Sequence, residues 1–161
     1  MTGPPPDPAF STTIALPDEG ATARLAADIA PLLGPGDALL LTGPIGAGKT
    51  AFARALIRAA TGNPTEEVPS PTFTLVQTYE TAKGEIWHTD LYRIGSEDEV
   101  IELGLDEALQ QEICLIEWPE KLGTFTPDNA LTLAFTTGDD GHSVTVTGNA
   151  DWRVRLGDKL G

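Results

Sequence analysis

The chain of 161 residues is long enough for one domain with one sizeable core, and its hydrophobic content of 40% fits a globular protein. It has no apolar run of about 18 residues that could span a bilayer, and its single cysteine excludes an intrachain disulfide. With 24 acidic and 10 basic residues, the net charge of −14 argues against direct binding to nucleic acids or to anionic membranes, although such charge also serves solubility.

The N-terminal segment differs in composition from the rest of the chain. Residues 1–9 are rich in proline and contain neither a basic residue nor an apolar stretch. We therefore expect a disordered tail rather than a signal peptide, followed by one domain over residues 10–161. Cys114 lies in an apolar run and is expected to be a core residue, and the lack of disulfides agrees with a reducing compartment such as the cytoplasm.

Segments with the patterns of strands and helices alternate along the chain. In chain order, the patterns predict a strand at 10–16, a helix from Asp18 to about 33, a strand at 38–42, a helix at 50–60, a hairpin of strands 73–80 and 85–91, two short helices within 96–109, a strand at 113–118, a hairpin of strands 130–136 and 143–147, and a short helix within 151–160. This order predicts an α/β fold, with a mixed and mainly parallel central sheet flanked by helices and with antiparallel hairpins at its edges.

The segment 43–50, GPIGAGKT, fits the pattern G-x-x-x-x-G-K-[ST] of the phosphate-binding P-loop. A buried strand is expected before it and a helix after it, which is the context that the motif requires. The backbone N–H groups of Gly46, Gly48, Lys49 and Thr50 can point into one concave nest for phosphate oxygens, at the positive end of the following helix. Lys49 is expected to reach the β and γ phosphates and the Thr50 hydroxyl to bind Mg²⁺, as in a single-domain P-loop NTPase.

Two acidic residues stand at the ends of predicted apolar strands. Glu117 follows residues 113–116, with the spacing of a Walker B acid, and Asp90 follows residues 86–89. Acids at this edge of an α/β sheet lie where ligands bind, although either could instead be a turn residue or a surface ion pair. The hydroxyl-rich loop 70–74, SPTFT, could sense a γ phosphate as switch loops do, or be an ordinary polar loop.

Three neighbours of these acids have two readings each. His88 on a strand is more often a hydrogen-bonded structural residue than a catalyst. Arg93 could act as an arginine finger, but pairing with the surplus of acids is favoured. Trp118 could stack on a base, but a place in the core is favoured.

Four blocks in this order together resemble the bacterial TsaE (YjeE) family, the ATPase subunit of tRNA threonylcarbamoyladenosine (t6A) synthesis. They are GAGKT at 46–50, SPTFTLV at 70–76, HTDLYR at 88–93 and EWPE at 117–120. The resemblance covers about residues 10–148, and four separate blocks make it more specific than a P-loop alone.

The resemblance implies a cytoplasmic ATPase that assembles with TsaB and TsaD and hydrolyses ATP slowly on its own. In that family, TsaD transfers a threonylcarbamoyl group to N6 of adenosine 37 of tRNA, and ATP hydrolysis by TsaE resets the complex between turnovers. The tRNA would be held by the partners, with no membrane and no DNA involved. The acidic charge fits this role.

The resemblance also implies roles for single residues. Asp90 is expected to bind Mg²⁺ beside Thr50, and Glu117 to lie near the metal and its waters. The expected catalytic residues are Lys49, Thr72, facing the γ phosphate, and Glu117. The residues expected to contact ATP are Gly43, Gly46, Ala47, Gly48, Lys49, Thr50, Ala51 and Trp118. The chain departs from the family at Pro44, Ile45 and Ala51, which are peripheral to the phosphate contacts.

Two other functions share the loop. A small-molecule kinase would need an acceptor pocket and usually a lid of arginines, for which 10 basic residues offer little. A nucleotide-switched binding module with little turnover is the other alternative. Glu117 and Thr72 favour hydrolysis over such a module, but the geometry of the site, which the sequence does not give, decides between them.

Overall fold

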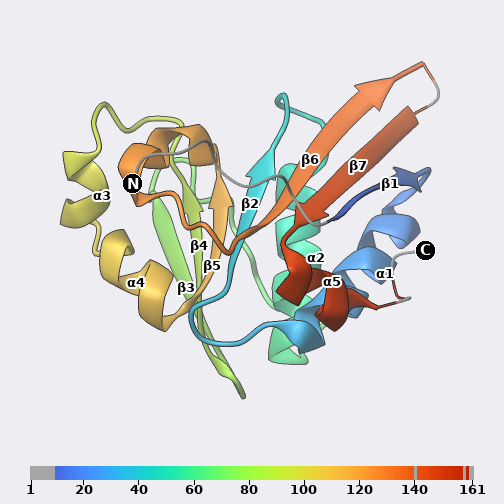
Figure 1. Ribbon diagram of the computed structural model, residues 1–161, viewed down its shortest axis with the longest axis horizontal. Coiled ribbons are helices and arrows are strands. Elements are labelled where there is room, and N and C mark those ends of the chain that lie inside the picture. Colours follow the sequence, from blue (N-terminus) through green and yellow to red (C-terminus); the bar gives the residue numbers. More distant parts are fainter. Residues whose placement is uncertain (1–9, 140, 158, 160–161) are drawn as a thin grey trace.

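Seven strands form one sheet in the computed structural model, which describes residues 10–139, 141–157 and 159 (Figure 1). The expected disordered tail, residues 1–9, lies outside the described residues. The strands are β1 (Phe10–Leu16), β2 (Ala38–Thr42), β3 (Val76–Thr81), β4 (Gly84–Asp90), β5 (Ile113–Glu117), β6 (Leu131–Gly138) and β7 (Gly141–Gly148). The helices are α1 (Glu19–Ile29), α2 (Lys49–Thr61), α3 (Asp98–Glu102), α4 (Leu105–Gln111) and α5 (Ala150–Leu156), with 3-10 segments at Ala30–Leu32 and Pro119–Phe125.

The strand order is β1-β7-β6-β2-β5-β4-β3. The pairs β2–β5, β2–β6 and β4–β5 are parallel, whereas β1–β7, β6–β7 and β3–β4 are antiparallel. The prediction of an α/β fold with a mixed sheet and antiparallel hairpins is confirmed. The parallel pairs join the four central strands β6, β2, β5 and β4, as predicted, and β1 adds a third antiparallel pair at the edge beside β7.

Helices cover both faces of the sheet. In Figure 1, α1 and α2 lie on one side of the central strands, with α3 and α4 on the other. Two clusters of buried apolar residues follow this division, one containing Phe52 and Leu56 of α2 and the other Leu105 and Leu109 of α4. Strands β2 and β5 lie between the two clusters, which explains why both are purely apolar until their last residues.

Most predicted elements are confirmed within one or two residues. The larger difference is at β3, which begins at Val76 rather than at residue 73. Leu75 has a φ of 68°, in the left-handed region, and this backbone turn ends the loop before the strand starts. Phe73, whose apolar side chain suggested a strand, is 80% exposed in that loop.

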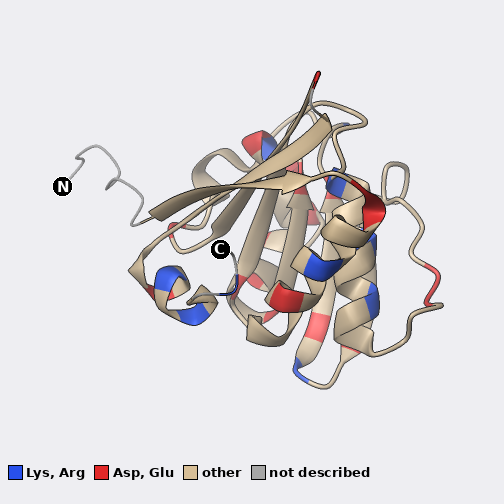
Figure 2. Ribbon diagram, turned by 90° about the vertical axis from the view of Figure 1, so that its right-hand side faces the viewer, with Lys and Arg blue, Asp and Glu red and all other residues tan. Residues whose placement is uncertain are grey.

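The surface agrees with the acidic composition. In the view of Figure 2, Lys and Arg residues are scattered over several helices and turns rather than gathered into one basic strip.

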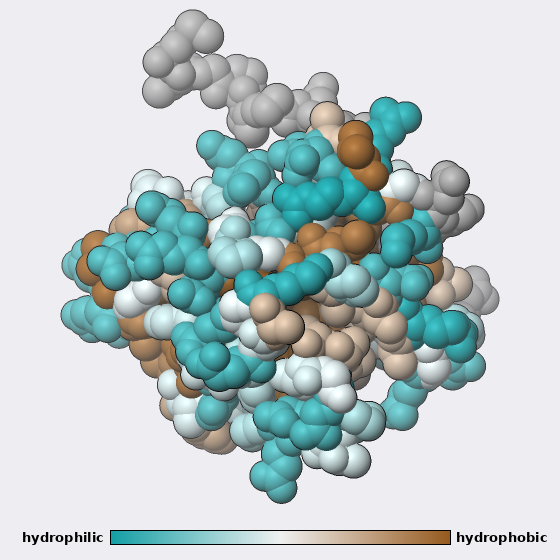
Figure 3. All heavy atoms as spheres, turned by 90° about the horizontal axis from the view of Figure 1, so that it is seen from below, coloured by the Kyte–Doolittle hydropathy of each residue, from teal (hydrophilic) through white to brown (hydrophobic). Residues whose placement is uncertain are grey.

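Among the helices that the structure describes, none combines the length and apolar character needed to cross a bilayer. At the amino ends of the parallel strands, apolar residues are visible between hydrophilic ones (Figure 3), and a cavity of about 190 Å³ lies beside the β3–β4 turn.

Cys114 is a core residue, as predicted, because its side chain in β5 is fully buried. Burial, with a smaller contribution from Glu112, raises the pKa of its thiol from 9.0 to about 12. We expect 5,5′-dithiobis(2-nitrobenzoate) to leave the folded chain unmodified at pH 8 and to react fully once guanidinium unfolds it.

The same pKa shift makes folding stability depend on pH. Above pH 9 the unfolded thiol loses its proton while the folded thiol keeps it, so the free energy of unfolding falls between pH 9 and about 12. In the modification experiment, a fast reaction of the folded chain with 5,5′-dithiobis(2-nitrobenzoate) at pH 8 would contradict the burial of Cys114.

Candidate functional site

A cleft of about 520 Å³ lies where β2, β4 and β5 end, next to the first turn of α2. This is the edge at which open α/β sheets bind ligands. The cleft is lined by Ile45, Gly46, Gly48, Lys49, Thr50, Ala51, Thr72, Asp90, Tyr92, Arg93, Glu117 and Trp118.

The loop between β2 and α2 is built on glycines with positive φ. Gly43, Gly46 and Gly48 have φ values of 130°, 84° and 113°, which side chains rarely permit. A Cβ atom on Gly43 would lie 2.3 Å from the carbonyl oxygen of Phe135 in β6. The loop therefore needs glycine at residue 43 both for its backbone and for the close approach of β6.

Replacing Gly43 by alanine is expected to destabilise the fold more than the same change at Gly46. Gly46 also has a positive φ, but nothing lies within 4 Å of a Cβ added there. Gly46→Ala should lower the free energy of unfolding by about 1 kcal/mol from backbone strain alone, and Gly43→Ala by about 3 kcal/mol or more. Chemical denaturation of the two variants measures the difference. Equal losses would mean that β6 does not press on the loop as the structure shows.

Lys49, the first residue of α2, is a buried cation at the floor of the cleft. Its side chain is only 5% exposed, its Nζ donates to the carbonyl oxygen of Gly43, and the same atom lies 4.0 Å from the centre of the Trp118 ring. The ion pairs among the described residues do not include Lys49. A buried ammonium group costs free energy unless a negative charge offsets it, so this arrangement suits an anionic ligand.

Asp90 and Glu117 lie side by side at the ends of β4 and β5, where they are partners in the parallel register. Both side chains are buried. Glu117 accepts a hydrogen bond from the Thr50 hydroxyl at 2.9 Å and faces His88 Nε2 at 2.7 Å. Asp90 accepts from the backbone N–H of Tyr92 at 3.0 Å. Both carboxylates therefore line the cleft, and Glu117 contacts the first turn of α2 through Thr50.

The loop before β3 brings a hydroxyl group to the same place. Thr72 donates to Asp90 Oδ2 at 3.3 Å and lies 2.7 Å from the Ser70 hydroxyl. Next to it, the Arg93 guanidinium stacks on the exposed Phe73 ring at 4.6 Å. Among the described residues Arg93 forms no ion pair, so the favoured reading that it pairs with an acid stays a prediction.

Trp118 forms an aromatic wall of the cleft. Its φ of 60° is one of two positive values at non-glycine residues in the described chain, and backbone strain of this kind often occurs at functional sites. The ring packs against Tyr92 with centroids 4.9 Å apart. Trp118 is partly buried: its side chain packs against the apolar cluster of α4, as the favoured reading expects, and it also lines the cleft.

Most of the residues expected from the sequence to contact ATP or Mg²⁺ line this cleft, but two do not. Gly43 lies against Phe135 of β6 instead, and Ala47 is buried, with its carbonyl oxygen 3.1 Å from His142 Nδ1. The sequence reasoning did not find Ile45, the Tyr92–Trp118 pair or the contact between His88 and Glu117. The two contacts join residues far apart along the chain, which no local pattern marks, whereas Ile45 lies within the P-loop motif itself.

The donor groups fit a divalent cation that is held partly by its ligand. Among residues 10–139, 141–157 and 159, no three side chains of His, Cys, Asp or Glu gather closely enough to hold a metal by themselves. Thr50, Asp90 and Glu117 offer hydroxyl and carboxylate oxygens, the atoms that Mg²⁺ prefers, and Mg²⁺ commonly takes its remaining ligands from phosphates and water.

Comparison with known proteins gives a consistent result. The family model described as "Threonylcarbamoyl adenosine biosynthesis protein TsaE" matches residues 16–144. The protein named "tRNA threonylcarbamoyladenosine biosynthesis protein TsaE" from Rickettsia felis is 48% identical over 105 residues, which are 65% of this chain and 61% of that protein. The proteins of the same name from Rickettsia bellii and Bacillus subtilis are 41% and 38% identical, over 78% and 70% of this chain and 86% and 70% of their own lengths.

A solved structure resembles nearly the whole chain. The crystal structure of Bacillus subtilis YdiB superposes with a TM-score of 0.72 and 27% sequence identity, and the match covers 94% of this chain and 93% of that one. The overall fold is therefore shared with a solved protein.

Proposed function

Because the chain belongs to the TsaE family of threonylcarbamoyl adenosine biosynthesis proteins, we propose that it is an Mg²⁺-dependent ATPase of the cytoplasm that supports t6A formation at adenosine 37 of tRNA. In this proposal it works in a complex with TsaB and TsaD. Those partners hold the tRNA, since the chain itself carries a charge of −14.

The observation that carries the proposal is Lys49, a buried cation without a described counter-ion. It begins a helix of 13 residues, after a loop in which Gly43, Gly46 and Gly48 have positive φ. In this proposal the N–H groups of that loop would cradle the phosphates. The positive end of the helix, the N–H groups and the ammonium group all favour the same kind of ligand, a chain of phosphates.

The other residues of the cleft complete an ATP site. Thr50, Asp90 and Glu117 would hold Mg²⁺, which offsets the negative charge of the phosphates when it is bound. Thr72, tied to Asp90, would face the γ phosphate. Trp118 would lie beside the nucleoside.

The residues that line the cleft favour hydrolysis over transfer to a metabolite. The basic residues among them are Lys49 and Arg93. Kinases of small molecules usually close several arginines over the phosphates, and the described chain offers no such group here. A nucleotide-switched binding module would share the site but not the turnover, so measured rates separate that possibility.

The test is ATP hydrolysis by the purified chain with Mg²⁺, alone and then with TsaB, TsaD and tRNA. Slow hydrolysis that rises on adding the partners is expected. Equal rates with and without them would count against the role in t6A synthesis. Bound ATP that stays intact for hours even with the partners would favour the binding module, and transfer of the γ phosphate to a metabolite would favour a kinase.

A further inference from the structure

His88 is a fully buried side chain in contact with one of the two acids of the site. It lies in β4, two residues before Asp90 and on the same face of the strand. Its Nε2 is 2.7 Å from Glu117 Oε2, while its Nδ1 has no hydrogen-bond partner among the described residues. His88 does not line the cleft, whereas Glu117, which it contacts, does.

The geometry identifies the nitrogen that carries the proton toward Glu117. A proton on Nδ1 alone would leave a buried donor without an acceptor and would set the lone pair of Nε2 against a carboxylate oxygen at 2.7 Å. A proton on Nε2 gives a hydrogen bond to Glu117 and leaves only an acceptor unpaired at Nδ1. His88 therefore donates to Glu117.

This bond orients a second one on the other oxygen of the same carboxylate. Glu117 Oε1 accepts from the Thr50 hydroxyl at 2.9 Å. A hydroxyl group has one hydrogen and two lone pairs, so donating the hydrogen to Glu117 leaves the lone pairs of Thr50 free on the cleft side. With Oε2 held by His88, the carboxylate cannot turn its plane without breaking one of these bonds.

We propose that His88 is a positioning residue: through Glu117 it holds the Thr50 hydroxyl with its lone pairs available to the divalent cation that accompanies ATP. The inference rests on the proposed function, because it concerns the same site. Hydrogen-bond partners behind metal ligands typically change metal affinity or activity by about 10-fold to 100-fold when they are replaced.

Two substitutions of similar polarity separate this role from a merely structural one. In His88→Gln the side-chain N–H can occupy roughly the position of Nε2 and reach Glu117. In His88→Asn the amide ends near the position of Nδ1 and falls short. A residue that only fills space or keeps the interior polar would tolerate the two changes to a similar degree.

The experiment measures the affinity for a non-hydrolysable ATP analogue, with EDTA and with Mg²⁺, for the parent chain and both variants. We expect similar affinities in EDTA for all three. We expect Mg²⁺ to strengthen binding in the parent and in His88→Gln, and this gain to fall by about 10-fold or more in His88→Asn. Melting temperatures of the variants show whether each is folded.

Two results would overturn the inference. One is a folded His88→Asn variant with the full Mg²⁺ gain of the parent, and the other is an equal loss of that gain in both variants. If the parent chain binds the analogue in neither condition, the proposed function itself fails and the inference fails with it. A double variant adds a check, because on a Glu117→Gln background the His88→Asn change should have little further effect on the Mg²⁺ gain.

Discussion

Lys49→Ala is expected to bind ATP at least about 30-fold more weakly than the parent and to remain folded. Hydrogen bonds to charged groups contribute about 1.5–3 kcal/mol each, and a loss of roughly 2 kcal/mol corresponds to this factor. The fold should not suffer, because the ammonium group is buried without a described counter-ion and its removal relieves a desolvation cost. Calorimetric titration gives the affinity, and thermal unfolding gives a melting temperature that should be equal or higher.

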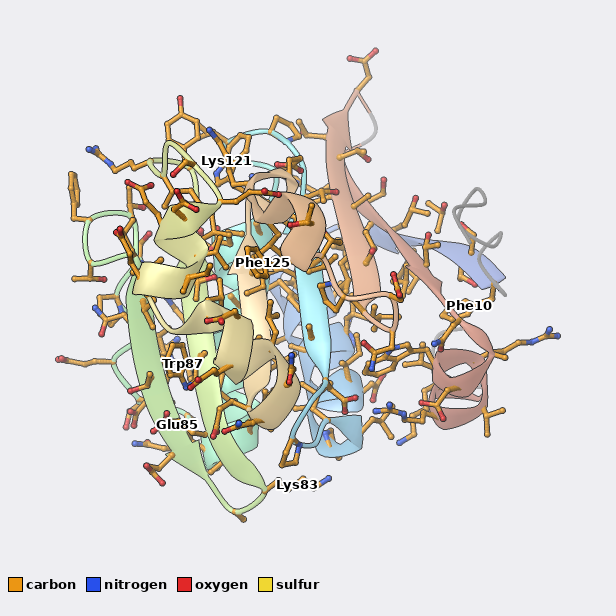
Figure 4. The ribbon with its side chains drawn as sticks, turned by 60° about the vertical axis from the view of Figure 1, so that its left-hand side comes forward. Phe10, Lys83, Glu85, Trp87, Lys121 and Phe125 are labelled. Carbon is orange, nitrogen blue, oxygen red and sulfur yellow. The ribbon has the colours of Figure 1, made fainter. Side chains whose placement is uncertain are left out.

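The matched control is Lys83→Ala, which removes the same charge at the other end of the molecule. Lys83 is exposed in the turn between β3 and β4. In Figure 4 it lies at the opposite end of the sheet from Lys121, which comes shortly after the cleft residue Trp118 along the chain. Lys83→Ala should bind ATP like the parent. A comparable loss in both variants would show that net charge, rather than Lys49 itself, governs binding.

Asp90→Asn is expected to lower Mg²⁺-dependent hydrolysis by roughly 100-fold, equivalent to about 2.7 kcal/mol. The asparagine oxygen can still accept from the N–H of Tyr92, so the loop after β4 should keep its shape. In EDTA the affinity for ATP should be unchanged or higher, because a negative charge beside the phosphates has been removed. Hydrolysis assays over a range of Mg²⁺ concentrations, with binding measured in EDTA, separate the two effects.

An acidic residue outside the cleft controls for the change in net charge. Glu107→Gln, on the exposed side of α4, should leave hydrolysis and its Mg²⁺ dependence as they are in the parent. If Asp90→Asn hydrolyses ATP like the parent, Asp90 is not a metal ligand and that assignment is wrong.

Local patterns predicted the elements of this fold well where each segment carries its own signal. The apolar run of β2 is one example. Another is α2, which begins after Gly48 and ends before Gly62, both of which adopt the left-handed conformation. Gly104 likewise separates α3 from α4. Periodicity and glycine placement are properties of neighbouring residues, so a single sequence reveals them.

Pairing between distant segments could not be predicted in the same way. Phe10 of β1 is opposite Gly148 of β7, and nothing local to either strand selects this partner. The pattern predicts a start of β3 that is too early, because Phe73 has the residue type of a strand but is exposed in the preceding loop, against Arg93.

The candidate site shows the same division. The strand-end positions of Asp90 and Glu117 could be derived from the sequence, because the carboxyl ends of parallel strands meet at one edge. The contact between His88 and Glu117 depends on the directions of two side chains from different strands. The position of Trp118 beside Lys49 depends on the positive φ of Trp118, which its residue type does not predict.

The most direct test of the central claim is a crystal structure of the chain with Mg²⁺ and a non-hydrolysable ATP analogue. The account predicts that the phosphates lie on the N–H groups of residues 46–50, with Lys49 withdrawn from Gly43 onto the β and γ phosphates. It also predicts a cation touching Thr50 and at least one of Asp90 and Glu117. A nucleotide bound elsewhere, or phosphates in the cleft without contact to Lys49, would contradict it.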